Sequence, residues 1–132
     1  EGEPARPLAE RRAKSSPLRD VAGLVRSFAY LAASGLGSGG AGQSELIEAR
    51  KRTTIERFHR VAESALLAAY SQASQSLPHQ WSTAHDWRRL LDLFLLEKAA
   101  YEVCYEAANR PSWLPVPLHG LTTLAERMLA VT

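Results

Sequence analysis

Apolar side chains recur every three or four residues along most of this chain, and no stretch alternates convincingly at period two. This spacing is typical of amphipathic helices rather than of β-strands. We predict helices over residues 17–33, 44–76, 86–108 and 118–129. The pattern therefore predicts an all-α fold, with residues 1–132 forming a single helical domain.

The segments that flank the first helix predict its ends. Ser16 offers an N-cap and Pro17 a suitable first helical residue. Residues 1–15 are polar with two prolines and predict an extended arm, while residues 35–42, GLGSGGAG, predict a glycine-rich loop. The loop contains a G-x-G-x-x-G spacing, but a helix precedes it and no strand or Walker lysine lies nearby. A flexible linker is therefore a better interpretation than a nucleotide-binding turn.

The connections between the later helices carry the prolines. Pro78 is expected to end the second helix, residues 77–86 to form a connection, and Asp86 to cap the third helix. Pro111, Pro115 and Pro117 predict an irregular corner before the last helix. Periodicity also selects the positions that we expect in the core. These are Val21, Leu24, Val25, Phe28 and Leu31, then Leu46, Ile47, Ile55, Phe58, Val61, Ala65, Leu66, Ala69 and Tyr70, and finally Leu93, Leu96, Ala100, Val103 and Ala107, with Trp81 and Trp87 as packing residues.

Charge and apolar content exclude two classes of partner. The formal net charge is +2, and the basic residues at 11–14 and 50–52 have acidic neighbours, so we expect solvated surface and no nucleic-acid binding. No apolar run approaches the ~18 residues that a membrane span needs, so we expect no membrane partner.

Cysteine and histidine usage argue against disulfide and metal chemistry. Cys104 is the single cysteine, so no internal disulfide can form, and we expect a reducing, cytoplasmic location. Its apolar neighbours predict a small buried side chain. The four histidines show no zinc-ligand spacing with Cys104 or with one another, so no metal site is predicted.

The end of the third helix holds the strongest candidate site. Positions four apart share a helix face, so one aromatic stripe and one carboxylate stripe run side by side toward an Asn-Arg-Pro-x-Trp corner. Proteins hold sugars in this way, because aromatic rings stack on the apolar face of the sugar while carboxylates and arginine bond to its hydroxyls. The alternative is that the tyrosines pack at the core edge and the glutamates face solvent. The candidates are Tyr101, Glu102, Tyr105, Glu106, Arg110 and Trp113.

The chain by itself shows no complete catalytic apparatus. It contains no Ser-His-Asp arrangement, no Cys-His pair and no metal cluster at recognisable spacing. Glu102 and Glu106 could be considered as a glycosidase acid and base, but two carboxylates one turn apart on one helix would hardly flank a bond. The sequence therefore predicts a binding surface without its own chemistry.

Three blocks of sequence, matched in order, carry a resemblance to a known family. Residues 1–4, Glu-Gly-Glu-Pro, resemble the tail of an Asp-Phe-Glu-Gly-Glu-Pro metal-binding segment; residues 19–32 and 90–121 supply the other two blocks. Together they resemble the C-terminal part of bacterial maltokinases. These are relatives of the aminoglycoside phosphotransferases with a protein-kinase-like bilobal fold, and they are often fused to a trehalose synthase.

The resemblance implies a function in trehalose, glycogen and α-glucan metabolism. The reaction would be ATP plus maltose giving ADP and maltose 1-phosphate, with Mg²⁺ and ATP as cofactors of the parent enzyme. The catalytic Asp, the metal-binding Asp and the phosphate-anchoring Lys of the family would lie in segments, including an N-terminal lobe, that this chain does not contain. The resemblance therefore implies that this chain alone is inactive and binds neither cofactor tightly.

Residue roles follow from the same resemblance. Glu1 and Glu3 would lie beside the metal and the acceptor hydroxyl. Asp20 would brace the catalytic loop, or would only complement the helix dipole in the first turn. The Tyr/Glu cluster would line the acceptor-sugar site, with Arg110 and Trp113 closing it.

Two other functions stay open at this point. A glucosamine or other amino-sugar kinase of the same fold has a similar C-terminal pattern. A non-catalytic helical interaction module would show no sugar dependence. The expected partners are thus a maltose-like sugar, the N-terminal kinase lobe and a trehalose synthase domain.

Overall fold

In a computed structural model, residues 7–37, 44–76 and 84–130 are described, and every regular element in these segments is helical. The all-α prediction is confirmed for this part of the chain. The elements are α1 (Leu8–Arg12), α2 (Leu18–Gly37), α3 (Glu45–Ser74), α4 (Ala84–Asn109), the 3₁₀ turn η1 (Pro111–Trp113) and α5 (Pro115–Leu129).

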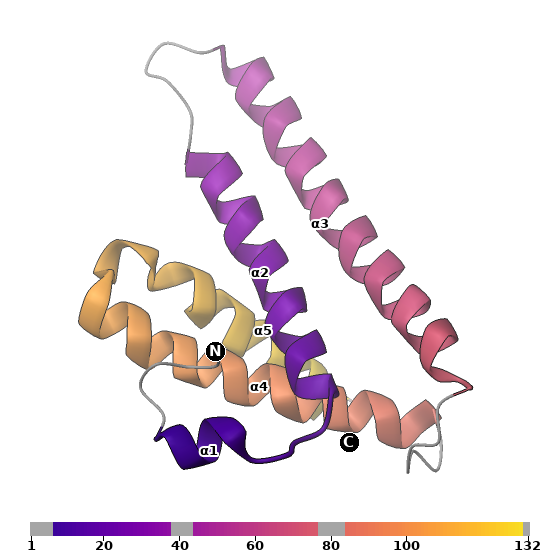
Figure 1. Cartoon of the computed structure of the whole chain (residues 1–132). Helices are drawn as coiled ribbons and strands as arrows, with labels where there is room; N and C mark the ends of the chain where they lie inside the picture. Colours follow the sequence, from indigo (N-terminus) through magenta and orange to yellow (C-terminus); the bar gives the residue numbers. More distant parts are fainter. Residues whose placement is uncertain (1–6, 38–43, 77–83, 131–132) are drawn as a thin grey trace.

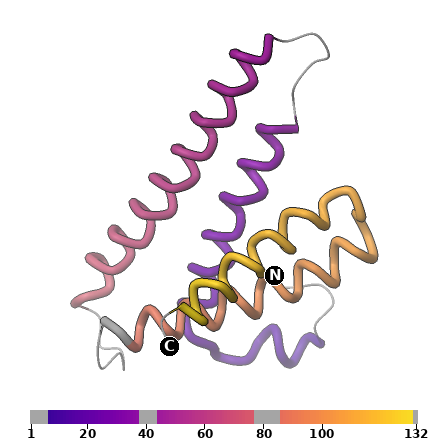
Figure 2. The backbone as a smooth tube through the Cα atoms, turned by 180° about the vertical axis from the view of Figure 1, so that it is seen from behind, coloured from indigo at the N-terminus to yellow at the C-terminus, as the bar shows by residue number. Residues whose placement is uncertain are grey.

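The long helices form two antiparallel pairs. Figure 1 shows α2 and α3 side by side, and α4 lying across the lower part of α2 with α5 returning along it. The view from behind in Figure 2 shows the same crossing. Because α2 contacts α3, α4 and α5, it is the central element of the fold.

The apolar core lies where α2, α4 and α5 meet. Side chains less than one-tenth exposed come from all three helices, and complete burial of one such aliphatic side chain contributes about 1.5–3 kcal/mol. A truncation such as Leu95→Ala would therefore leave a cavity between helices. The core residues are Leu18, Val21, Ala22, Val25, Leu91, Leu95, Ala99 and Leu124.

The start of α2 follows the sequence rule. Ser16 Oγ accepts a hydrogen bond of 3.3 Å from the Leu18 N–H, and the Pro17 carbonyl accepts one of 3.2 Å from the Val21 N–H. Ser16 therefore caps the helix as predicted, and Pro17 lies immediately before its first residue rather than being that residue.

The end of α2 differs from the prediction. The helix continues four residues past Ala33 to Gly37, so the expected glycine loop is helical at residues 35–37. A Cβ on Gly35 would lie 3.0 Å from Ile55 Cδ1, which shows how closely α3 packs here. Tertiary packing against α3 therefore offsets the low helix propensity of glycine. Residues 38–43 lie outside the described part of the chain.

Two other segments that were predicted to be irregular are partly helical. The predicted arm at residues 1–15 contains the short helix α1, while residues 1–6 lie outside the described segments. The predicted proline corner is shorter than expected, because α5 already begins at Pro115. A proline in the first helical turn lacks only an N–H that would have no intrahelical partner there. The predicted connection at 77–86 is helical from residue 84 and lies outside the description at 77–83, which include Pro78 and Trp81.

The predicted core face of α4 is wrong by about one residue. Leu93 is 53% exposed and Ala100 and Ala107 are exposed, whereas Leu91, Leu95 and Ala99 are buried. The first half of α4 is apolar on several sides, so periodicity there does not select one face.

Some core positions predicted on α2 and α3 are also exposed. Leu24 is 48% and Leu31 54% exposed on α2, although Val21 and Val25 are buried as predicted. Along α3, Ile55, Leu66 and Tyr70 are half-buried, and four large apolar side chains are more than half exposed. Those four are Leu46, Ile47, Phe58 and Val61.

Cys104 was predicted to be buried, and the structure contradicts this. Its thiol is exposed on α4, one position beyond the half-buried Val103. Among the described helices, none has the length and apolar character that crossing a membrane requires.

Candidate functional site

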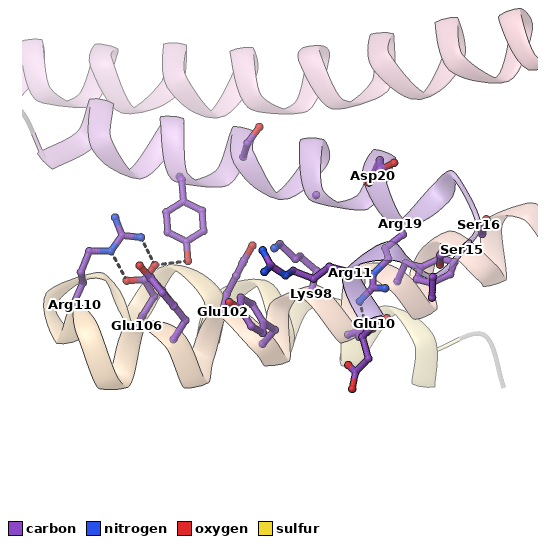
Figure 3. A pocket seen from close by; sticks show the side chains of 18 residues that line it. Glu10, Arg11, Ser15, Ser16, Arg19, Asp20, Lys98, Glu102, Glu106 and Arg110 are labelled. Carbon is purple, nitrogen blue, oxygen red and sulfur yellow. Dashed lines mark hydrogen bonds and ion pairs between the residues drawn. The ribbon is translucent and has the colours of Figure 1, made fainter. Parts of the chain in front are cut away.

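A cleft of about 690 Å³ lies between α1, one face of α2 and α4. We call it the first cleft, and Figure 3 shows the side chains that line it. Glu106 and Arg110 lie at one end, while Asp20, Ser15 and Ser16 lie at the other. Five of the six sugar-site candidates, Tyr101, Glu102, Tyr105, Glu106 and Arg110, are among its lining residues.

The two tyrosines form the predicted aromatic stripe. The rings of Tyr101 and Tyr105 stack with centroids 6.3 Å apart and an interplanar angle of 19°. Lys98 Nζ lies 5.0 Å from the centroid of the Tyr101 ring. The tyrosines are neither sealed in the core nor fully exposed, and both line the cleft.

Glu106 is the best-connected carboxylate in the cleft. It is 1% exposed, and its Oε1 accepts hydrogen bonds from the Tyr30 hydroxyl at 3.0 Å and from Arg110 Nη2 at 2.6 Å. Its Oε2 accepts a third, from Arg110 Nε at 2.9 Å. Figure 3 shows these contacts as dashed lines. The two-point contact with Arg110 fixes both planar groups.

Glu102 pairs with Arg26 one helical turn earlier. Arg26 Nε donates to Glu102 Oε2 at 2.9 Å, and Arg26 Nη2 lies 2.8 Å from the same oxygen as an ion-pair contact without hydrogen-bond geometry. Both residues are less than one-tenth exposed. The alternative prediction, in which Glu102 and Glu106 face solvent, is therefore wrong. Both carboxylates face α2.

Arg110 lies between aromatic rings at one end of the cleft. Its guanidinium carbon is 5.6 Å from the centroids of both the Tyr105 and Trp113 rings. Trp113 in turn stacks on Tyr30, with centroids 5.9 Å apart. Trp113 does not itself line the cleft, so the structure gives it the position of a support for Arg110 and Tyr30.

Burial and charge shift three pKa values around these pairs. Burial raises the pKa of the Glu102 carboxyl above its ordinary value of 4.5, although the Arg26 charge opposes the shift. Burial, followed by the Glu102 charge and the hydrogen bond to Glu106, raises the pKa of the Tyr30 phenol. The hydrogen bond to Glu106 also raises the pKa of the Arg110 guanidinium. Tyr30 is therefore a stable neutral donor.

Asp20 lies away from the sugar-site candidates, among polar groups at the other end of the cleft. It is exposed in the first turn of α2, where its charge complements the helix dipole. Its predicted role as a brace remains a prediction. Nearby, Arg19 Nη2 donates to Glu97 Oε1 at 3.2 Å and ties α2 to α4. Glu1 and Glu3 lie outside the described residues.

Sequence reasoning missed Arg26 and Tyr30. They are four residues apart on α2, and they meet Glu102 and Glu106, which are four residues apart on α4. A cation and a phenol in the otherwise apolar run VRSFAYLA were the available signal, because buried polar groups require partners. The matched spacing on the two helices indicates that the pairs also set the register of α2 against α4.

Glu102 and Glu106, two glutamates of the first cleft, are paired within the protein. No group of three or more His, Cys, Asp or Glu side chains gathers as a metal-ligand set within residues 7–37, 44–76 and 84–130. Glu102 and Glu106 are both held by protein cations, which leaves neither as a poised acid or base. What this end of the cleft offers is aromatic faces, the half-exposed Arg110 and hydrogen-bonding edges. No protein-family model matches the chain.

Proposed function

We propose that this chain is the acceptor-sugar-binding part of an ATP-dependent maltokinase with a protein-kinase-like fold. One observation carries the proposal: the aromatic and carboxylate stripes of α4, Arg110 and Asp20 of α2 all line one cleft. In the resemblance described above, the α4 residues and Arg110 line the acceptor-sugar site, and Asp20 braces the catalytic loop. The proposal assigns Mg²⁺ and ATP to parts of the enzyme that this chain does not contain.

The lining of the cleft suits a saccharide. Its volume of about 690 Å³ lies within the range of roughly 300–1,000 Å³ that is common for small-molecule sites. The stacked rings of Tyr101 and Tyr105 offer apolar surface for a sugar face, and the half-exposed Arg110 offers donors for hydroxyls. Glu106 fixes the direction of that guanidinium, so Arg110 would meet the sugar with little loss of side-chain freedom.

Charge pairing favours a neutral sugar over an amino sugar. Each carboxylate beside the tyrosines already has a cationic partner within the protein, Arg26 for Glu102 and Arg110 for Glu106. A sugar ammonium group would therefore meet no unpaired carboxylate at this end of the cleft, and Lys98 would repel it. Maltose fits these conditions better than glucosamine.

The test is an ADP-release assay on the complete gene product, with maltose and with glucosamine as acceptors. We expect turnover with maltose, and Tyr105→Ala should raise KM for maltose by about tenfold or more, because stacking surface is lost. Cys104→Ala is the matched control, since this exposed neighbour on α4 does not line the cleft. Turnover with glucosamine but not maltose would reject the assigned acceptor.

A second measurement separates binding from catalysis. Maltose at ten to one hundred times its Kd should stabilise a binding lobe by about 1.4–2.7 kcal/mol. The 132-residue chain alone should release no ADP, so turnover by it would contradict the assignment of the nucleotide apparatus to other segments. The complete gene product serves as the control for a weak half-site.

A helical interaction module is the second candidate, favoured by α3. Leu46, Ile47, Phe58 and Val61 are each more than half exposed, and exposed apolar surface of this kind is typical of protein contacts. This candidate expects a melting temperature that no sugar changes. The maltose titration therefore decides between the two functions.

A further inference from the structure

A second cavity, of about 400 Å³, lies on the face of α2 that points away from the first cleft. α2, α3 and α5 form most of its wall, and α4 contributes Leu95. Small side chains create the space, since Ala29, Ala32 and Ala33 on α2 face Gly120 on α5. We call this space the second cavity.

Arg26 is an unusual residue for the wall of a largely apolar cavity. It is 5% exposed, and its Nη2 has no hydrogen-bond partner despite the ion-pair contact with Glu102. The guanidinium lies so close to Gly120 that any Cβ at this position would collide with it. Nε lies 2.9 Å and Nη2 2.8 Å from Glu102 Oε2, whereas Nη1 is the guanidinium atom nearest Gly120 in the cavity wall, where a bound acceptor could reach it.

The guanidinium groups of the wall favour a hydrogen-bond acceptor on the ligand. The guanidinium groups of Arg26 and Arg127 both belong to the wall, whereas their carboxylate partners, Glu102 and Asp92, do not. Glu63 is the one carboxylate among the lining residues that the structure describes. A ligand carboxylate would therefore meet guanidinium N–H donors at the Arg26 side of the cavity, whereas an ammonium group, itself only a donor, would meet no acceptor there.

The rest of the wall requires an apolar body on the same ligand. Val25, Leu95, Val116 and Leu124 contribute aliphatic surface, and the alanines of α2 add methyl groups. A ligand that carried only charge would leave this surface in contact with water, while a purely apolar ligand would cover Arg26 Nη1 without offering it an acceptor.

We propose that the second cavity binds a small apolar carboxylate, with its head group toward Arg26 and its hydrocarbon chain along the aliphatic wall. The proposal goes beyond the sugar-binding function and does not depend on it. A volume of about 400 Å³ lies within the usual range for ligands of this size.

Three ligands of equal chain length test the proposal by isothermal titration of the protein. Octanoate should bind at one site, octan-1-ol about tenfold or more weakly because a charged acceptor is missing, and octylamine more weakly still. Absence of saturable octanoate binding below its micelle concentration would overturn the proposal. Equal binding of octanoate and octylamine would do the same, because it would show that no guanidinium selects the head group.

Variants locate the site. Ala33→Leu should fill the cavity and weaken octanoate by about tenfold or more, while Ala68→Leu, an exposed alanine on α3 outside the cavity, should leave it unchanged. Unchanged affinity in Ala33→Leu would place the ligand elsewhere and reject the proposal.

A double substitution tests the head-group contact. Arg26→Gln with Glu102→Gln removes both charges together and should abolish the preference for octanoate over octan-1-ol. Retention of that preference in a double variant with native helical circular dichroism would reject the role of Arg26. If this variant does not fold, the three-ligand comparison and Ala33→Leu still decide the proposal.

Discussion

α2 contacts α4 and α3 in two very different ways. Against α4 it buries aliphatic side chains and makes paired polar contacts, in which Arg26 meets Glu102 and Tyr30 meets Glu106. Against α3 the apolar contacts are half-buried, and Ser74 is the only buried residue of α3 within the described part of the chain.

The difference between the two interfaces shows which contacts determine the register of one helix against another. Apolar surface gives most of the free energy of burial but tolerates sliding, whereas a buried ion pair is favourable only when both partners align. The α2–α4 interface therefore has one register, and residues of this interface border both the first cleft and the second cavity. The α2–α3 interface has fewer such constraints.

Arg26→Ala is the substitution at the α2–α4 interface that should lower stability most. It leaves the Glu102 carboxylate buried without its cation, and we expect a loss of about 3–5 kcal/mol in the free energy of unfolding. Urea denaturation measures it. Arg19→Ala, which removes a partly exposed pair with Glu97, should cost less than about 1 kcal/mol and is the control. Equal losses in the two variants would contradict the special status of the buried pair.

Gly120→Val, a substitution on α5, should disturb the same Arg26–Glu102 pair. The new side chain would displace the Arg26 guanidinium, and overpacking of this kind costs about 1–3 kcal/mol. Thermal unfolding gives the measurement, with Gly23→Ala on α2 as the control because a Cβ there meets no neighbour. A Gly120→Val protein as stable as the parent would show that the guanidinium can move aside.

Tyr30→Phe removes one of the three hydrogen bonds to Glu106 and keeps the ring that stacks on Trp113. We expect a loss of about 1.5 kcal/mol, since the acceptor is an ionised carboxylate. Chemical denaturation of the two proteins side by side tests this. An unchanged stability would indicate that Arg110 alone satisfies Glu106.

The pH dependence of stability sharpens the description of Glu102. Because burial raises the pKa of its carboxyl, the folded protein holds this proton at a pH where the unfolded chain has released it. Its contribution to stability is therefore complete below 4.5 and is lost as the pH rises through the folded-state pKa. The stability of the parent minus that of Glu102→Gln should therefore fall as the pH is raised above 4.5. A rise over this range would mean that the Arg26 charge outweighs burial.

The smallest effect is expected on α3. Phe58 is 51% exposed, so Phe58→Ser should change the free energy of unfolding by less than about 0.5 kcal/mol. Leu95→Ala, in the core between α2 and α4, provides the contrast at about 2–5 kcal/mol. A large loss in Phe58→Ser would show that this face of α3 is covered.

The positions of the helices could be predicted from the sequence, whereas the buried face of each helix was harder to predict. The periodic apolar runs and the Ser16-Pro17 start placed the long helices within a few residues of their observed bounds. The core side of α4 could not be read in the same way, because leucines occur around much of its circumference. Glu102 and Glu106 are buried on the side that periodicity assigned to polar contacts.

The candidate site shows the same division. Spacing alone paired Tyr101 with Tyr105 and Glu102 with Glu106, since a helix brings positions four apart together. It did not reveal that Arg26 and Tyr30, 76 residues away in the chain, complete those pairs. That contact depends on how α2 crosses α4.

The local features of this protein, namely the helices, the cap at Ser16 and the two stripes on α4, can be predicted from its amino-acid sequence. They follow from steric and hydrogen-bonding preferences that act over a few residues. The three-dimensional arrangement of the helices selects which face of each helix is buried, which cation partners each glutamate, and where the first cleft and second cavity open. Those outcomes depend on packing between distant segments, and a buried charge is tolerated only where the fold brings its partner to it.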